Sequence, residues 1–150
     1  MSRKRENVRQ CKAIRQLIDD NKYTKALELI DAIPLEEVGS LDDLYRYAEL
    51  YEKAERMDKK KEIFYHIYHR THSRYMLNRL LRLTIRMGDM EEARELYFAY
   101  EVAGPITLDT FELRYLLAKA EGEPPERLIQ ILEELKKEEY TEEWGFRVAC

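Results

Sequence analysis

A short pattern recurs four times at a nearly constant interval, and this repetition constrains the fold more than any other feature of the chain. In each copy, a small or basic residue is followed four positions later by a bulky apolar one. The four pairs are Ala26 and Ile30, Lys60 and Phe64, Ala93 and Tyr97, and Arg127 and Ile131. Their first members are 34, 33 and 34 residues apart. A period of roughly 20 to 50 residues is typical of repeat architectures, and repetition favours binding over catalysis.

Apolar residues follow helical spacing almost throughout the chain. The 150 residues include only five Gly and four Pro, too few for many strands joined by tight turns. Gly88 and Gly122 suit helix ends, and Ser40 with Asp43, like Asp89 with Glu92, predicts a helix N-cap. The expected helices cover about 6–20, 23–33, 41–56, 58–71, 73–87, 90–102, 107–121, 125–139 and 142 onward.

These helices come in pairs with short loops, and a single pair cannot bury its apolar faces alone. We therefore expect an all-α fold, a right-handed superhelical solenoid of antiparallel helix pairs in one domain over 1–150. It would contain four complete hairpins, about 7–40, 41–73, 74–107 and 108–140, and a truncated fifth first helix over 141–150. Trp144, Phe146 and Val148 would leave that last helix with an unpartnered apolar face. We expect that the chain is a fragment of a longer protein; the alternative is that a second copy covers this face.

Part of the repeat has a recognisable signature. Leu44, Tyr47, Ala48 and Tyr51 place bulky, small and aromatic residues along a first helix, and Ala93 with Tyr97 follows on a second. This arrangement resembles the tetratricopeptide repeat family, over nearly the whole chain. The chain departs from the family pattern where Ala is usual, at Lys60 and Arg127, and at Leu81 and Tyr115, where a small residue is usual. A related helical-hairpin solenoid is the alternative.

The resemblance implies a function in binding, with ligands held in a concave groove lined by the first helices. Arg82 and Arg86 are four apart and share a helix face, and Arg with Tyr is enriched where partners bind. An arginine fork suits an acidic partner. The groove residues implied by the resemblance are Tyr45, Glu49, Tyr75, Asn78, Arg79, Arg82, Arg86 and Glu112. The alternative interpretation is that these arginines pair with acids of neighbouring helices or stay solvated. The family's carboxylate clamp is not expected, because its Lys and Asn residues are missing.

The expected function is therefore a non-enzymatic scaffold that binds a peptide or partner helix, with no catalytic residue, cofactor or metal. His66 and His69 are three apart on one helix, but two ligands make a weak metal site. Neither a glycine-rich phosphate loop nor a Ser-His-Asp grouping is present.

Two other functions remain as alternatives. Seven basic side chains within the first 22 residues suggest contact with RNA, although the net charge of −4 argues against a nucleic-acid binder. The repeats could instead serve as a structural spacer, or self-associate through the truncated C-terminal helix. Two distant cysteines, Cys11 and Cys150, an N-terminus without signal-peptide character and the lack of a membrane-spanning apolar run predict a cytoplasmic protein.

Overall fold

A computed structural model describes the backbone of residues 3–149 and the side chains of residues 5–137. The described residues form eight α-helices and one short 3-10 helix, with no strand, which confirms the all-α prediction. Contacts divide the chain into two compact units, 1–72 and 73–150. The boundary falls next to an expected repeat boundary, so each unit holds two of the predicted hairpins. The prediction of a single repeat domain stays a prediction.

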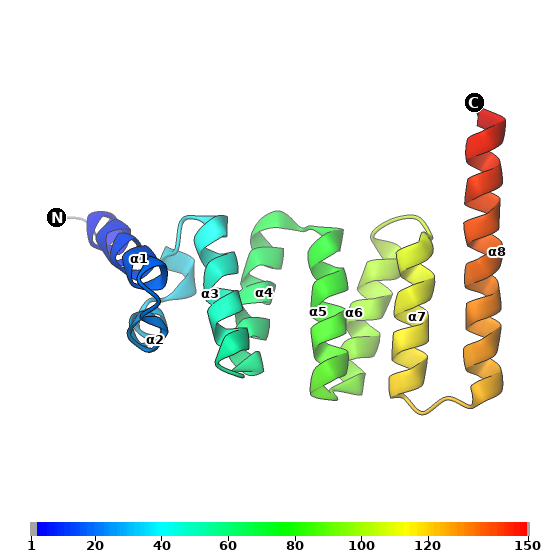
Figure 1. Cartoon of the computed structure of the whole chain (residues 1–150), viewed down its shortest axis with the longest axis horizontal. Helices are drawn as coiled ribbons and strands as arrows, with labels where there is room; N and C mark the ends of the chain where they lie inside the picture. The colour runs from blue at the N-terminus through cyan, green and yellow to red at the C-terminus, as the bar shows by residue number, and fades with distance from the viewer. Residues whose placement is uncertain (1–2, 150) are drawn as a thin grey trace. The chain divides into compact units, whose positions relative to one another are not determined.

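The first unit contains two helix pairs (Figure 1). Helix α1 spans Arg3–Asp19 and packs against α2, Tyr23–Ala32, while α3, Leu41–Lys53, packs against α4, Met57–Thr71. Between the pairs lies the 3-10 helix η1, Leu35–Glu37, in a segment expected to be an irregular loop. Pro34 cannot donate a backbone hydrogen bond, which explains why α2 ends before it. Contacts of α2 with α3 and of α4 with η1 join the two pairs.

The second unit repeats this plan (Figure 1). Helix α5 spans Arg74–Met87 and packs against α6, Met90–Val102, while α7, Leu108–Ala120, packs against α8, Pro125–Ala149. Here α7 contacts both α5 and α6. The two predicted N-caps are confirmed, since the Ser40 side chain accepts from the Asp43 backbone N–H and the Asp89 side chain from that of Glu92.

The first helix of every pair ends in the same backbone motif. A residue with positive φ follows each of them: Asn21 (60°), Glu55 (59°), Gly88 (82°) and Gly122 (78°). The next backbone N–H then bonds a carbonyl five residues earlier, from Lys22 to Leu17, Arg56 to Tyr51, Asp89 to Thr84 and Glu123 to Ala118. This pattern is the Schellman motif, which satisfies carbonyls left open at a helix end. The four left-handed residues are 34, 33 and 34 apart, so the period in the sequence also appears in the backbone.

Each unit buries its own apolar core. In the first unit Ile14, Leu44, Tyr47, Ile63 and Ile67 are at most 1% exposed. The second unit buries five comparable side chains: Met76, Leu80, Leu81, Leu113 and Ile131. Burying one such side chain contributes about 1.5–3 kcal/mol, so these clusters hold the pairs together.

The repeat positions lie largely in these cores. Ala26 and Ala93 are fully buried, as expected where two helices cross closely, and Lys60 is buried at the equivalent position. Arg127 breaks the pattern, because it is exposed and bonds Gln130 in its own helix. Val8, an apolar residue of α1, is 61% exposed.

The expected ninth helix is wrong as a separate element. Helix α8 runs without a break from Pro125 to Ala149, through Thr141, where the truncated fifth first helix was expected to start. Neither Pro nor Gly lies between 126 and 144, and one Thr within a helix costs well under about 1 kcal/mol. The backbone ladder therefore continues. The predicted apolar face of 141–150 and Cys150 lie outside the side chains that the structure describes.

Candidate functional site

Helix α5 separates an apolar face from a cationic one. Its buried residues are Met76, Leu77, Leu80, Leu81, Leu83 and Thr84. The predicted groove residues Tyr75, Asn78, Arg79, Arg82 and Arg86 lie on the remaining surface, and all are exposed or half-buried. The helix contains four arginines and no acidic residue. This combination makes its solvent-facing side positively charged.

The structure brings three of the predicted residues into one network. The Arg82 Nε donates to the Asn78 Oδ1 at 2.7 Å, and its Nη1 lies 3.1 Å from the Glu112 Oε1. Asn78 lies one turn before Arg82 on α5, while Glu112 belongs to α7. The network thus fixes the direction of the Arg82 guanidinium and ties the first helices of two hairpins. It also bears out the alternative interpretation for Arg82, which pairs with an acid of a neighbouring helix.

The other predicted residues of α5 extend this surface. Tyr75 is 62% exposed, and the Arg79 guanidinium carbon lies 5.7 Å from the centre of its ring. A cation at this distance from an aromatic face is attracted to the ring. Arg86, in the last turn of α5, is exposed. We call Tyr75, Arg79, Arg82, Arg86 and Glu112 the arginine face.

The two remaining predicted residues belong to the first unit. Tyr45 is half-buried and Glu49 is exposed, both on α3. Each therefore keeps surface that a ligand could touch within its own unit.

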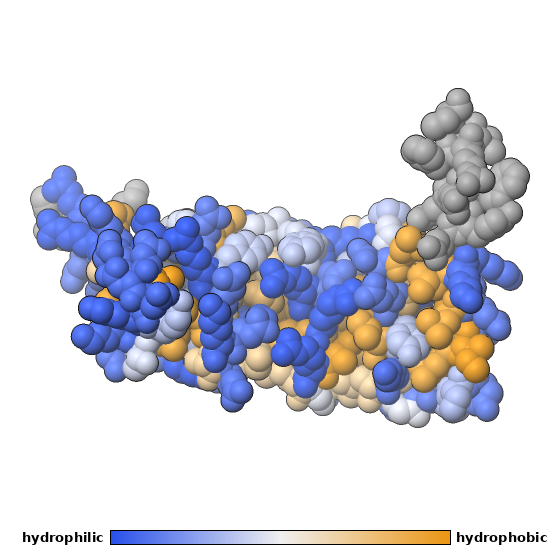
Figure 2. All heavy atoms as spheres, viewed as in Figure 1, coloured by the Kyte–Doolittle hydropathy of each residue, from blue (hydrophilic) through white to orange (hydrophobic). Residues whose placement is uncertain are grey.

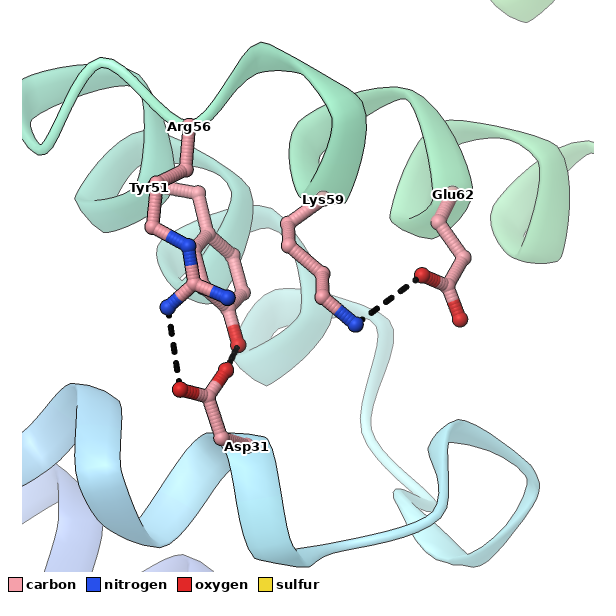
Figure 3. Close-up of polar contacts among 5 residues, drawn as sticks. All are labelled: Asp31, Tyr51, Arg56, Lys59 and Glu62. Carbon is pink, nitrogen blue, oxygen red and sulfur yellow. Dashed lines mark hydrogen bonds and ion pairs between the residues drawn. The ribbon is translucent and has the colours of Figure 1, made fainter.

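A polar cluster in the first unit was not predicted. Asp31 on α2 accepts hydrogen bonds from the Tyr51 hydroxyl on α3 and, at 2.9 Å, from Arg56 just before α4 (Figure 3). The Arg56 guanidinium carbon lies 4.9 Å from the centre of the Tyr51 ring. Hydrogen bonding to Arg56, supported by the bond from Tyr51, holds the pKa of Asp31 below its usual value. The cluster joins α2, α3 and the residue that precedes α4, and Asp31 is too far from the other two in sequence for any motif to reveal it.

A cavity of about 470 Å³ lies beside this cluster. The end of α2, the η1 segment and α4 form its walls, with charged or polar side chains from Asp31, Glu36, Lys59, Glu62 and His66. Lys59 and Glu62 pair with each other across 3.5 Å (Figure 3). Of these wall groups, Asp31, Lys59 and Glu62 already have charged partners, which makes this part of the cavity a poor match for a charged ligand.

Of the three histidines, His69 and His72 lie beside tyrosine rings, and His66 is half-buried. Burial lowers the pKa of His66, and the nearby Arg70 acts in the same direction. The His69 ring lies 6.3 Å from that of Tyr65, and the His72 ring 6.0 Å from that of Tyr68. Among the residues that the structure describes, no group of three or more His, Cys, Asp or Glu side chains could hold a metal ion.

Comparison with models of protein families, with curated proteins and with solved structures finds no match for this chain. None of the helices in the described part of the chain is long and apolar enough to cross a membrane.

Proposed function

We propose that this chain is a non-enzymatic binding scaffold. Its helix pairs would be tetratricopeptide-like hairpins that stack in a right-handed superhelix and hold a peptide or partner helix on the side of the first helices. Two observations support the repeat: the Schellman motif returns every 33 or 34 residues, and Ala26, Lys60 and Ala93 are buried at the same interval. Stacked helix pairs of this kind present extended surfaces suited to binding.

The arginine face is the observation that carries the proposal. Helix α5 carries arginines at 79, 82 and 86 on its solvent-facing side, and its own sequence contains no acidic residue. The bond from Arg82 to Asn78 reduces the side-chain freedom that a ligand would otherwise have to restrict. Tyr75 adds a large, exposed ring beside these cations. Arginine and tyrosine together dominate the binding energy of many interfaces.

The chemistry of this face selects an acidic partner. A guanidinium group binds carboxylates through two parallel hydrogen bonds. Arg82 already binds one carboxylate through a single contact, from its Nη1 to the Glu112 Oε1 at 3.1 Å. A peptide carboxylate could take the place of Glu112 or add to it, while an apolar side chain of the peptide packs on Tyr75.

The test is a titration of the full chain with a labelled acidic peptide that carries Glu and Leu at helical spacing, together with any partner recovered by pull-down. The double variant Arg82→Glu with Arg86→Glu should weaken binding about tenfold or more, since each tenfold change corresponds to about 1.4 kcal/mol. Arg127→Glu is the matched control, because Arg127 is also an exposed arginine of the second unit. It should leave the affinity unchanged.

A charge swap separates binding from folding. Arg82→Glu alone places two acids together, whereas Arg82→Glu with Glu112→Arg restores the ion pair in the opposite direction. The swap should restore the free energy of unfolding that Arg82→Glu alone loses. If the affinity for the acidic peptide nevertheless stays low, then the arginine at 82 acts in binding. Unchanged affinity in the double variant at 82 and 86 would refute the assignment of the arginine face.

A further inference from the structure

Helix α6 has an unusual outer face. Phe98 is 71% exposed and Val102 is 70% exposed, and they are four residues apart on one side of the helix. Ile106, four positions further along and just past the helix end, is 51% exposed. The buried residues of α6, Ala93, Leu96 and Tyr100, lie on the opposite side. Apolar side chains thus occupy a surface that a helix pair normally leaves polar.

Acidic residues continue this stripe toward the start of α6. Glu91 and Glu95 precede Phe98 by seven and three residues, so helical spacing puts all three on the same side. Both glutamates are exposed, and neither forms an ion pair with a side chain that the structure describes. The nearby Arg94 is directed to Glu121 at 3.4 Å. The stripe therefore changes from negative to apolar along the helix. We call Glu91, Glu95, Phe98, Val102 and Ile106 the α6 stripe.

Arg74 bonds the backbone at the end of α6, beside the apolar part of the stripe. Its Nε donates to the carbonyl of Tyr100 at 2.9 Å, and its guanidinium carbon lies 4.1 Å from the centre of the Tyr100 ring. Gly104 makes room for it, because a Cβ at that position would lie 2.7 Å from the Arg74 Nη1. The first residue of α5 thus fixes both the end of α6 and the turn that leads to Ile106. Backbone that is fixed in advance costs less entropy on binding.

We propose that the α6 stripe is a second binding surface and that its occupant is a basic amphipathic helix of another protein. The apolar side chains of that helix would pack on Phe98, Val102 and Ile106, and its Lys or Arg residues would face Glu91 and Glu95. Charge complementarity identifies the occupant, because the stripe offers acids and apolar groups without a free cation of its own. This surface and its partner differ from the arginine face, which selects acidic ligands.

The probe is a labelled peptide that carries Leu and Lys at helical spacing, titrated against the full chain by fluorescence anisotropy. Phe98→Ser with Val102→Ser should weaken binding about tenfold or more, as expected when central apolar anchors are lost. Glu91→Lys with Glu95→Lys should also weaken it. Circular dichroism should show both variants folded, because none of the four side chains is buried.

Two controls make the test specific. Ile129→Ser removes an apolar side chain of α8 that is 55% exposed, in the same unit, and should leave the affinity unchanged. The double variant Arg82→Glu with Arg86→Glu should also leave the affinity for the Leu and Lys peptide unchanged. Failure of this inference can then be distinguished from failure of the proposed function.

Three results would overturn the inference. The first is equal affinity of the wild type and the variant at 98 and 102. The second is an equal loss of affinity in the Ile129→Ser control, which would indicate nonspecific binding to exposed apolar side chains. The third is concentration-dependent self-association in sedimentation that disappears in the variant at 98 and 102, because a second copy would then occupy the stripe.

Discussion

At the scale of single residues, Lys60 is the most informative departure from the repeat. It stands at the position equivalent to Ala26 and Ala93 in the repeat, and it is only 6% exposed. Its Nζ lies 3.0 Å from the Glu52 Oε1 and 5.3 Å from the centre of the Phe64 ring. The buried ammonium is therefore tolerated because α3 supplies a carboxylate and α4 an aromatic face.

Removing Lys60 and removing Glu52 should change the free energy of unfolding by different amounts. Lys60→Met replaces a buried ion with an apolar group of similar length, which is often neutral or stabilising. Glu52→Gln leaves the ammonium without its counter-charge and should cost about 1–3 kcal/mol of unfolding free energy. Urea denaturation measures both values.

The exposed pair of Lys59 and Glu62 provides the control for this comparison. Lys59→Met should change the unfolding free energy by less than about 1 kcal/mol, because surface ion pairs contribute little. A larger loss in Lys60→Met than in Glu52→Gln would show that the ammonium itself stabilises the fold.

His66 gives the first unit a dependence on pH. Burial lowers its pKa below the usual 6.5, so the unfolded chain binds this proton more readily than the folded one. The resulting stabilisation is complete above the pKa of the unfolded state and is lost as the pH falls through the pKa of the folded state.

The melting temperature of the wild type should therefore fall relative to that of His66→Gln as the pH decreases from about 7.5 toward 5, around the usual histidine pKa of ~6.5. Thermal unfolding at several pH values, followed by circular dichroism, measures the difference. His72→Gln, at an exposed helix end, serves as the control. A constant difference between wild type and His66→Gln across this range would contradict the assignment.

At the scale of helices, the chain uses one solution four times to end the first helix of a pair. The left-handed position holds glycine at 88 and 122 but Asn21 and Glu55 in the first unit. Glycine adopts this conformation without steric cost, whereas most residues with a Cβ do not. The first unit thus carries backbone strain that the second avoids.

Substitutions at these left-handed positions should change the free energy of unfolding in opposite directions in the two units. Gly88→Ala should cost about 1 kcal/mol, while Glu55→Gly should be stabilising by up to about 1 kcal/mol. No heavy atom lies within 4 Å of a Cβ added at Gly88, so the effect there comes from the backbone alone.

Gly39→Ala is the control, because Gly39 has no positive φ and the same free space. It should be neutral or slightly stabilising, since Ala restricts the unfolded chain. Chemical denaturation of the three variants gives the comparison, and destabilisation by Glu55→Gly would argue against strain at that position.

At the scale of the whole molecule, charge and apolar surface are unevenly distributed. Figure 2 shows hydrophilic side chains over α1, whereas apolar side chains gather over α7 and the described part of α8. Ile129 and Leu132 on α8 are 55% and 39% exposed. Within the second unit, α5 presents arginines and α6 presents glutamates with apolar residues. A molecule with such distinct surfaces is suited to holding partners of different chemistry.

The sequence by itself determined the helices, their pairing order and most of their ends. Local causes were enough: helical spacing of apolar residues, Pro34, the caps at Ser40 and Asp89, and the glycines at 88 and 122. It failed at Thr141, where a plausible cap stands within a segment that has no helix breaker, so the helix continued.

Only the tertiary structure decided which polar residues meet. Asp31, Tyr51 and Arg56 are 20 and 25 residues apart and come together because α2 packs on α3. In the same way, Arg82 bonds Glu112 because α5 packs on α7, and Arg74 bonds the carbonyl of Tyr100 because α5 packs on α6. Helical periodicity is a local property that residues carry along the chain, whereas the partner of a charged side chain depends on how helices pack. The repeat could therefore be read from the sequence, and the contacts that shape its surfaces could not.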